Sequence, residues 1–91
     1  MFLPIENIYD ADLIRQDNNG CIYLCYLNPE LSTDKKRQTD IEDQNCWRIV
    51  KISQIEDNGV TYTFRKYPNG DAYNYNYAPT DIDNYTFDFR R

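Results

Sequence analysis

The pattern of hydrophobic and polar residues predicts short β-strands along most of the chain. Residues 21–27, CIYLCYL, are apolar on both sides of an extended segment, as in a strand that is covered on both faces. Residues 60–67, VTYTFRKY, alternate instead, with Val60, Tyr62 and Phe64 on one face, which predicts a half-buried strand. No stretch of about ten residues carries a sustained helical period. The pattern therefore predicts an all-β domain: a small antiparallel sheet or small barrel of about five to six short strands.

Asn-Gly pairs at 58–59 and 69–70 predict two tight hairpin turns, because Asn and Gly adopt positive φ at little cost. Together with the apolar segment CWRIVKI at 46–52, they predict a three-stranded antiparallel meander over 46–77. Its third strand has Tyr at every second position. We expect most of this Tyr row to be core and the opposite polar face to be open to a neighbouring subunit. The Tyr row is Tyr73, Tyr75 and Tyr77, and the polar face is Asn74, Asn76, Thr61 and Thr63.

The chain is expected to form a single β domain over 1–91. Residues 1–14 sustain neither period and are interpreted as an arm or an edge strand. Residues 28–45 are the longest polar stretch and are predicted to be a long surface loop. The segment 46–89 holds the meander and a last strand, joined by one short helical turn. Thr80 and Asp81 are the candidate caps of that turn, and Tyr85, Phe87 and Phe89 share one face of the last strand.

The charge balance argues against nucleic-acid and membrane partners. Ten basic and 15 acidic residues give a formal net charge of −5, and a field of this sign repels phosphates and anionic lipid. No apolar run reaches the roughly 18 residues of a membrane span, and the first residues lack a signal-peptide pattern. We expect a soluble, unsecreted chain. Its three cysteines lie in apolar segments, which favours reduced core thiols over a disulfide framework: Cys21, Cys25 and Cys46.

The sequence offers little for catalysis or metal binding. It contains no histidine, the commonest general base and transition-metal ligand. No activating neighbour lies beside the thiols, and three thiolates are too few for a structural zinc site. The carboxylate pairs Asp81/Asp83 and Glu42/Asp43 lack the spacing of a calcium loop and are interpreted as solvated turn acids. We predict a non-enzymatic protein with no catalytic residue, no cofactor and no metal ion.

Two features are candidates for binding a partner. A strand that displays alternate aromatics is similar to the platforms of single-strand binders, but without a basic groove it favours a protein or a neutral glycan. The loop over 28–45 has a length that often orders against a partner, and it carries the one local basic cluster. Acids at 34 and 40 bracket that cluster, which favours a balanced surface over a phosphate site. The basic cluster is Lys35, Lys36 and Arg37.

Four elements follow one another in the second half of the chain: a Trp-Arg-Ile strand at 47–49, an Asn-Gly hairpin at 69–70, an aromatic strand over 73–77 and a Thr-aromatic strand at 85–87. In this order they resemble a family of very small proteins that tailed bacteriophages encode, typically among their virion genes. The resemblance covers 46–89. Where that family has Trp followed by acids and an Arg, this chain has Tyr-Ala-Pro, so no role of that Trp or Arg carries over.

The resemblance implies a virion component or virion-associated protein of the head, neck or tail, with no enzymatic site to transfer. Such a protein is made in the bacterial host cytoplasm and resides in the virion, bound to other virion proteins or to itself in many copies. The richness in Asn, Ile, Tyr and Asp suggests an AT-rich genome, as in many phages of gut Bacteroides. The alternative is a phage-encoded acidic inhibitor of a host nucleic-acid-handling or defence protein. The expected partner-binding residues are Trp47, Tyr73, Tyr75, Tyr77, Lys35, Lys36 and Arg37.

Overall fold

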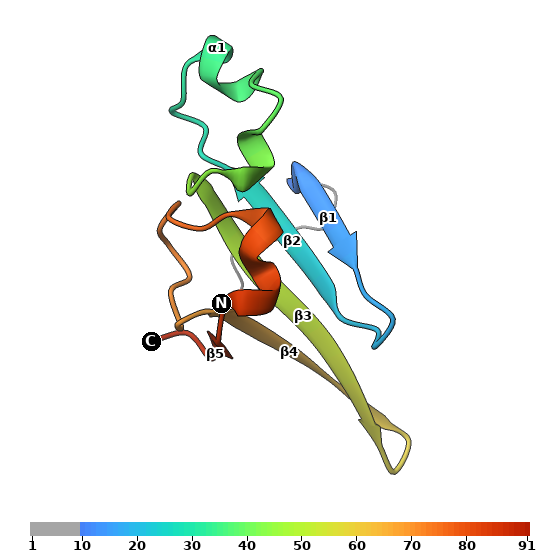
Figure 1. Cartoon of the computed structure of the whole chain (residues 1–91). Helices are drawn as coiled ribbons and strands as arrows, with labels where there is room; N and C mark the ends of the chain where they lie inside the picture. The colour runs from blue at the N-terminus through green and yellow to red at the C-terminus, as the bar shows by residue number, and fades with distance from the viewer. Residues whose placement is uncertain (1–9) are drawn as a thin grey trace.

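The computed structural model describes residues 10–91, which form one open antiparallel sheet of five strands (Figure 1). Each strand pairs with the next one along the chain, so the sheet order is β1-β2-β3-β4-β5. This confirms the predicted all-β fold, as an open sheet. Most of the arm or edge strand predicted over 1–14 lies outside the described residues, and β1 is the edge strand beside β2. The strands are β1 (Leu13–Gln16), β2 (Ile22–Leu27), β3 (Trp47–Asp57), β4 (Val60–Pro68) and β5 (Phe87–Asp88).

Three short helical segments connect the strands. They are the single turn α1 (Thr33–Lys36) and the 3₁₀ turns η3 (Ile41–Asp43) and η4 (Pro79–Asn84). The sequence predicted one such turn, at the position of η4, whereas α1 and η3 lie inside the long polar loop. The Ser32 hydroxyl caps α1 by accepting the Lys35 N–H at 3.2 Å. No side chain caps η4, and the Thr80 hydroxyl donates instead to the Glu42 carbonyl at 3.2 Å.

The core lies on both faces of β2 and of the first half of β3, as the apolar pattern of CIYLCYL predicted. On one face η3 and η4 contribute Ile41 and Ile82 to a cluster with Ile49 of β3. On the other face Leu24 and Val50 form a second cluster, which includes side chains from β4 and from the segment after it. Both clusters are thin, as expected for a chain of this size. Most of the buried hydrophobic residues belong to β2 and β3.

The chain beyond the Asn69-Gly70 turn does not form the predicted third strand of the meander. Asn69 and Gly70 do adopt positive φ, as a tight primed turn requires. However, β4 ends at Pro68, and residues 71–77 are irregular apart from one isolated bridge between Tyr77 and Trp47. The prediction of three strands over 46–77 is therefore wrong in its last strand.

Two interactions explain this outcome. The Asp71 carboxylate accepts the backbone N–H groups of Tyr73 and Asn74, both at 3.1 Å, which folds the chain into a local turn instead of an extended strand. The place beside β4 is taken by β5, in which Asp88 pairs with Tyr67. Because 71–77 is not a strand, the predicted flat polar face of Asn and Thr side chains does not form.

Candidate protein-contact surface

The hairpin of β3 and β4 extends beyond the rest of the sheet. β2 pairs with β3 only from Trp47 to Ile52, whereas β3 and β4 stay paired as far as Asp57 and Val60. Asn58 and Gly59 close the hairpin with φ of 52° and 81°, which is the type I′ geometry that Asn-Gly predicts. We call residues 53–64 the projecting hairpin, and it accounts for much of the elongated shape, 50 × 29 × 24 Å (Figure 1).

One face of the projecting hairpin is apolar and exposed. Ile55 lies opposite Tyr62 in the register, so both side chains point to the same side, and Phe64 and Val60 follow at alternate positions. Ile55, Tyr62 and Val60 are 55%, 50% and 50% exposed. Phe89, 58% exposed, lies beside Phe64 with ring centroids 6.2 Å apart. We call this group the hairpin face: Ile55, Val60, Tyr62, Phe64 and Phe89.

The half-buried strand predicted for 60–67 is therefore buried only at its end. Tyr67 and Pro68 are buried, while Val60 and Tyr62 lie on a part of the hairpin that no other described strand or helix covers. Single exposed apolar side chains are ordinary, but a contiguous group on one face marks a contact surface.

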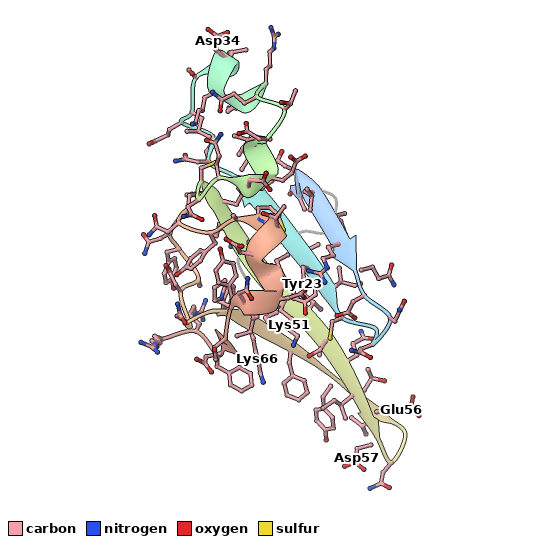
Figure 2. All side chains as sticks on the ribbon, viewed as in Figure 1. Tyr23, Asp34, Lys51, Glu56, Asp57 and Lys66 are labelled. Atoms are coloured by element: carbon pink, nitrogen blue, oxygen red, sulfur yellow. The ribbon has the colours of Figure 1, made fainter. Side chains whose placement is uncertain are left out.

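Charged residues bound the hairpin face at both ends (Figure 2). At the base, Lys51 and Lys66 lie directly opposite each other in the β3–β4 register. Their ammonium groups lie 5.8 Å and 4.9 Å from the ring centroids of Phe87 and Phe89. At the tip, Asp57 shares the face with Val60. The surface thus has a basic base, an apolar centre and an acidic tip.

The predicted Tyr row is split among three environments. Tyr73 is 61% exposed, Tyr75 packs against the cluster of Leu24 and Val50, and Tyr77 packs against the cluster on the other face of the sheet. The expectation of one shared face is wrong, because the irregular chain over 71–77 does not alternate as a strand does.

Tyr77 and Asp71 form the best-defined polar contact of this segment. The Tyr77 hydroxyl donates to the Asp71 carboxylate at 2.8 Å. Partial burial, together with this bond, raises the pKa of Tyr77 to about 12. Burial also acts to raise the pKa of Asp71, but hydrogen bonds from Tyr73, Tyr77 and Asn74 outweigh it and hold that pKa below its usual 3.8. The pair positions the 71–77 segment.

Trp47 belongs to the core of the isolated chain. Its side chain is 3% exposed, and its indole N–H donates to the Ile41 carbonyl at 2.9 Å. Burial with a satisfied N–H is the usual arrangement of a structural tryptophan. The structure therefore places this residue away from any surface that a partner could reach.

The basic cluster lies far from the other predicted contact residues. Lys35 and Lys36 are in α1 and Arg37 follows directly, at the opposite end of the molecule from the projecting hairpin (Figure 1). The Lys36 ammonium donates to the Pro29 carbonyl at 3.0 Å, which fixes the loop onto itself. The structure thus brings the basic cluster together with neither Trp47 nor the Tyr residues.

The cysteines are free thiols in or beside the core. Burial raises the pKa of Cys25 to about 12 and also raises that of Cys46, so both thiols stay protonated at neutral pH. Within residues 10–91 no group of three or more Cys, Asp or Glu side chains is arranged to hold a metal ion.

Comparison with protein-family models, curated proteins and solved structures finds no match to this chain. In the part of the chain that the structure describes, no helix is both long enough and apolar enough to cross a membrane.

The hairpin face was missed in the sequence, although one signal of it was present. The apolar segment 21–27 is much shorter than the segment from 46 to the Asn58-Gly59 turn, so part of that hairpin had to extend past its neighbour. The alternation of Val60, Tyr62 and Phe64 indicates a face, but it does not indicate whether anything covers it.

Proposed function

We propose that this protein is a non-enzymatic structural or virion-associated component of a tailed bacteriophage, acting through protein–protein contacts in many copies. The observation that carries the contact function is the hairpin face, an exposed apolar surface on an element that projects from a thin domain. The resemblance over 46–89 supplies the virion context. In this proposal the protein is made in the host cytoplasm and is bound in the particle to other virion proteins or to itself.

The design of the domain fits such a role. The two central strands and the turns η3 and η4 form a small stable body, and the projecting hairpin presents its side chains away from that body. A modest interface in each copy becomes strong when many copies are arrayed on one particle. The contact residues in this proposal are those of the hairpin face instead of Trp47.

Mass spectrometry of purified virions tests the proposal. We expect the protein at a fixed stoichiometry relative to the major virion proteins. A phage that carries Ile55→Thr with Tyr62→Thr should incorporate less of it, because these changes remove the centre of the hairpin face and keep β-forming residues. Gln54→Thr, on the opposite face of the same hairpin, is the matched control. Absence of the protein from wild-type particles contradicts the proposal.

A second candidate function is inhibition of a host nucleic-acid-handling or defence protein. One observation favours it: η3 and η4 lie in contact, which gathers acids from two distant segments on one side of the sheet. Only Asp83 of these acids is paired, with Arg15 at 2.9 Å, among the ion pairs of the described residues. The acids of η3 and η4 are Glu42, Asp43, Asp81 and Asp83.

Capture from host lysate distinguishes this candidate. An inhibitor should retain a DNA- or RNA-handling enzyme or a defence protein, and Lys substitutions at 81 and 83 should weaken that capture. Loss of the exposed Arg15–Asp83 pair costs the fold little, so the variant remains folded. Unchanged capture by the variant excludes nucleic-acid mimicry through this surface.

A further inference from the structure

The hairpin face carries opposite charges at its two ends and apolar side chains between them. The base row is Lys51 and Lys66, and the tip row is Asp57 and Val60. Like charges directly opposite each other on a sheet are unfavourable, and among the described residues no carboxylate lies within ion-pair distance of either lysine. Asp57 likewise has no basic partner within residues 10–91. Within residues 10–91, therefore, neither end of the face has a counter-charge beside it, and each end carries the charge that the other end lacks.

We propose that the hairpin face binds the hairpin face of a second copy of this chain, with the two hairpins antiparallel. A two-fold axis runs across the strands, between the Ser53–Phe64 row and the Ile55–Tyr62 row. It places each base row over the tip row of the other copy, so that Lys51 faces Asp57. The Ser53–Phe64 row of one copy then packs on the Ile55–Tyr62 row of the other, and Phe89 extends the contact beside Val60. The interface is isologous, as in most dimers.

Charge selects this orientation over the parallel one. In a parallel stack both base rows would meet, with four lysine ammonium groups at one end and two Asp57 carboxylates at the other. Juxtaposed like charges disfavour that arrangement, whereas the antiparallel stack pairs opposite charges at both ends. The apolar centre supplies the attraction, and the charged ends set the direction.

The size of the surface indicates a weak dimer. Aromatic side chains bury about 150–250 Å² each, so at half exposure Tyr62 and Phe89 each contribute about 100 Å². With Ile55, Val60 and Phe64, two copies bury on the order of 1,000 Å² in total, the lower end for a specific interface. The net charge of −5 on each chain opposes association. We therefore expect a dimer that forms only at high protein concentration.

Sedimentation equilibrium of the purified full-length chain tests this pairing. Between about 10 μM and 1 mM protein the mean mass should rise from monomer toward dimer. Ile55→Thr with Tyr62→Thr should weaken the dimer by at least about tenfold, because both changes remove apolar contact area. Gln54→Thr should leave the association unchanged, since position 54 points to the other face of the hairpin.

A charge exchange provides the sharper test. One variant, Lys51→Glu with Lys66→Glu, has acidic residues at both ends of the face, and another, Asp57→Lys, has basic residues at both ends. Each variant alone should remain monomeric. An equimolar mixture should associate one to one, because every base row then faces a tip row of opposite charge. Recovered association also shows that both variants are folded.

Several results would overturn the proposal. A wild-type chain that is monomeric at about 1 mM has no self-contact of this kind, even where it binds a different protein through the hairpin face. A dimer that survives Ile55→Thr with Tyr62→Thr uses another surface, such as the strand edges. Failure of the mixed variants to associate excludes the antiparallel orientation. Because these measurements use the isolated chain, they succeed or fail independently of its presence in virions.

Discussion

Ile49 and Ile55 lie on the same face of the same strand, six residues apart, yet their environments are opposite. Ile49 is fully buried beneath the turns η3 and η4, whereas Ile55 is more than half exposed on the projecting hairpin. The two positions have the same residue type, backbone conformation and direction. What differs is whether other segments cover the side chain. Strand formation is therefore independent of burial in β3, and burial is what distinguishes the core from the contact surface.

Truncation of these two isoleucines should give the largest difference in stability. Ile49→Ala removes methyl groups from a closed core and should lower the free energy of unfolding by about 2–5 kcal/mol. Ile55→Ala should cost less than about 0.5 kcal/mol at a protein concentration where copies do not associate. Urea denaturation followed by tryptophan fluorescence measures both. Equal losses would mean that the hairpin face is covered in solution.

Replacement of the two glycines of the primed turns should give the next largest difference in the free energy of unfolding. Both Gly59 and Gly70 have positive φ, so alanine should cost roughly 1 kcal/mol at either position. A Cβ at Gly59 meets nothing within 4 Å, but at Gly70 it would lie 2.8 Å from the Phe89 carbonyl oxygen. This clash should make Gly70→Ala the costlier change by on the order of 1–3 kcal/mol in urea denaturation. Similar costs would contradict the close packing of the C-terminal segment on the second turn.

A third comparison concerns the polar groups of two aromatic side chains, the indole N–H of Trp47 in the core and the hydroxyl of Tyr62 on the projecting hairpin. Trp47→Phe removes the donor to the Ile41 carbonyl and part of the ring that fills the core. Its cost should be about 1–3 kcal/mol. Tyr62→Phe, on the exposed face, should change the free energy of unfolding by less than about 0.5 kcal/mol. Circular dichroism follows both unfolding transitions, and a neutral Trp47→Phe would contradict the buried position of the indole.

The smallest effect should appear at the Asp71–Tyr77 hydrogen bond and should depend on pH. Since the folded-state pKa of Asp71 is lowered, its contribution to stability is present above pH 3.8 and is lost as pH falls through the lowered value. Tyr77→Phe should therefore cost about 0.5–1.5 kcal/mol at neutral pH and progressively less in acid. Tyr73→Phe, on an exposed ring, is the control. A loss that is the same at all pH values would mean that the Asp71 charge is not involved.

The sequence predicted the strands that rest on strong local signals. The doubly apolar CIYLCYL became the covered strand β2, and Asn58-Gly59 became the primed turn between β3 and β4. The last strand was predicted at 85–89 and is found, shorter, as β5. These elements follow from side-chain alternation and from the φ that a turn requires, both of which a sequence records directly.

The Tyr-Asn alternation over 73–77 shows a case in which such a local signal does not predict the structure. Tyr73 to Tyr77 alternate as a strand does, but the Asp71 side chain competes successfully for the backbone N–H groups that begin the segment. Pairing beside β4 then passes to β5, which follows later in the chain. Alternation alone could not predict this, because it does not identify the partner strand.

The candidate contact surface was predicted least well, for a related reason. Trp47 was expected at an interface as a large aromatic, and it is core because η3 supplies both cover and a carbonyl acceptor. Val60, Tyr62 and Phe64 were expected on a half-buried strand. Val60 and Tyr62 are exposed because β2 does not extend along this part of β3, and only Phe64 is partly buried. Exposure is a property of neighbouring segments, and residue type alone does not encode it.

The sequence by itself determined an acidic all-β chain with one doubly apolar strand, primed Asn-Gly turns and no histidine, since composition, alternation and turn geometry are local properties. Only the tertiary structure decided which strands pair, which face of β3 the turns η3 and η4 cover, and where along β3 this cover ends. Those outcomes depend on the competition of distant segments for the same edge and the same apolar face. The hairpin face, and with it the proposed pairing of two copies, exists because that cover ends at the middle of β3.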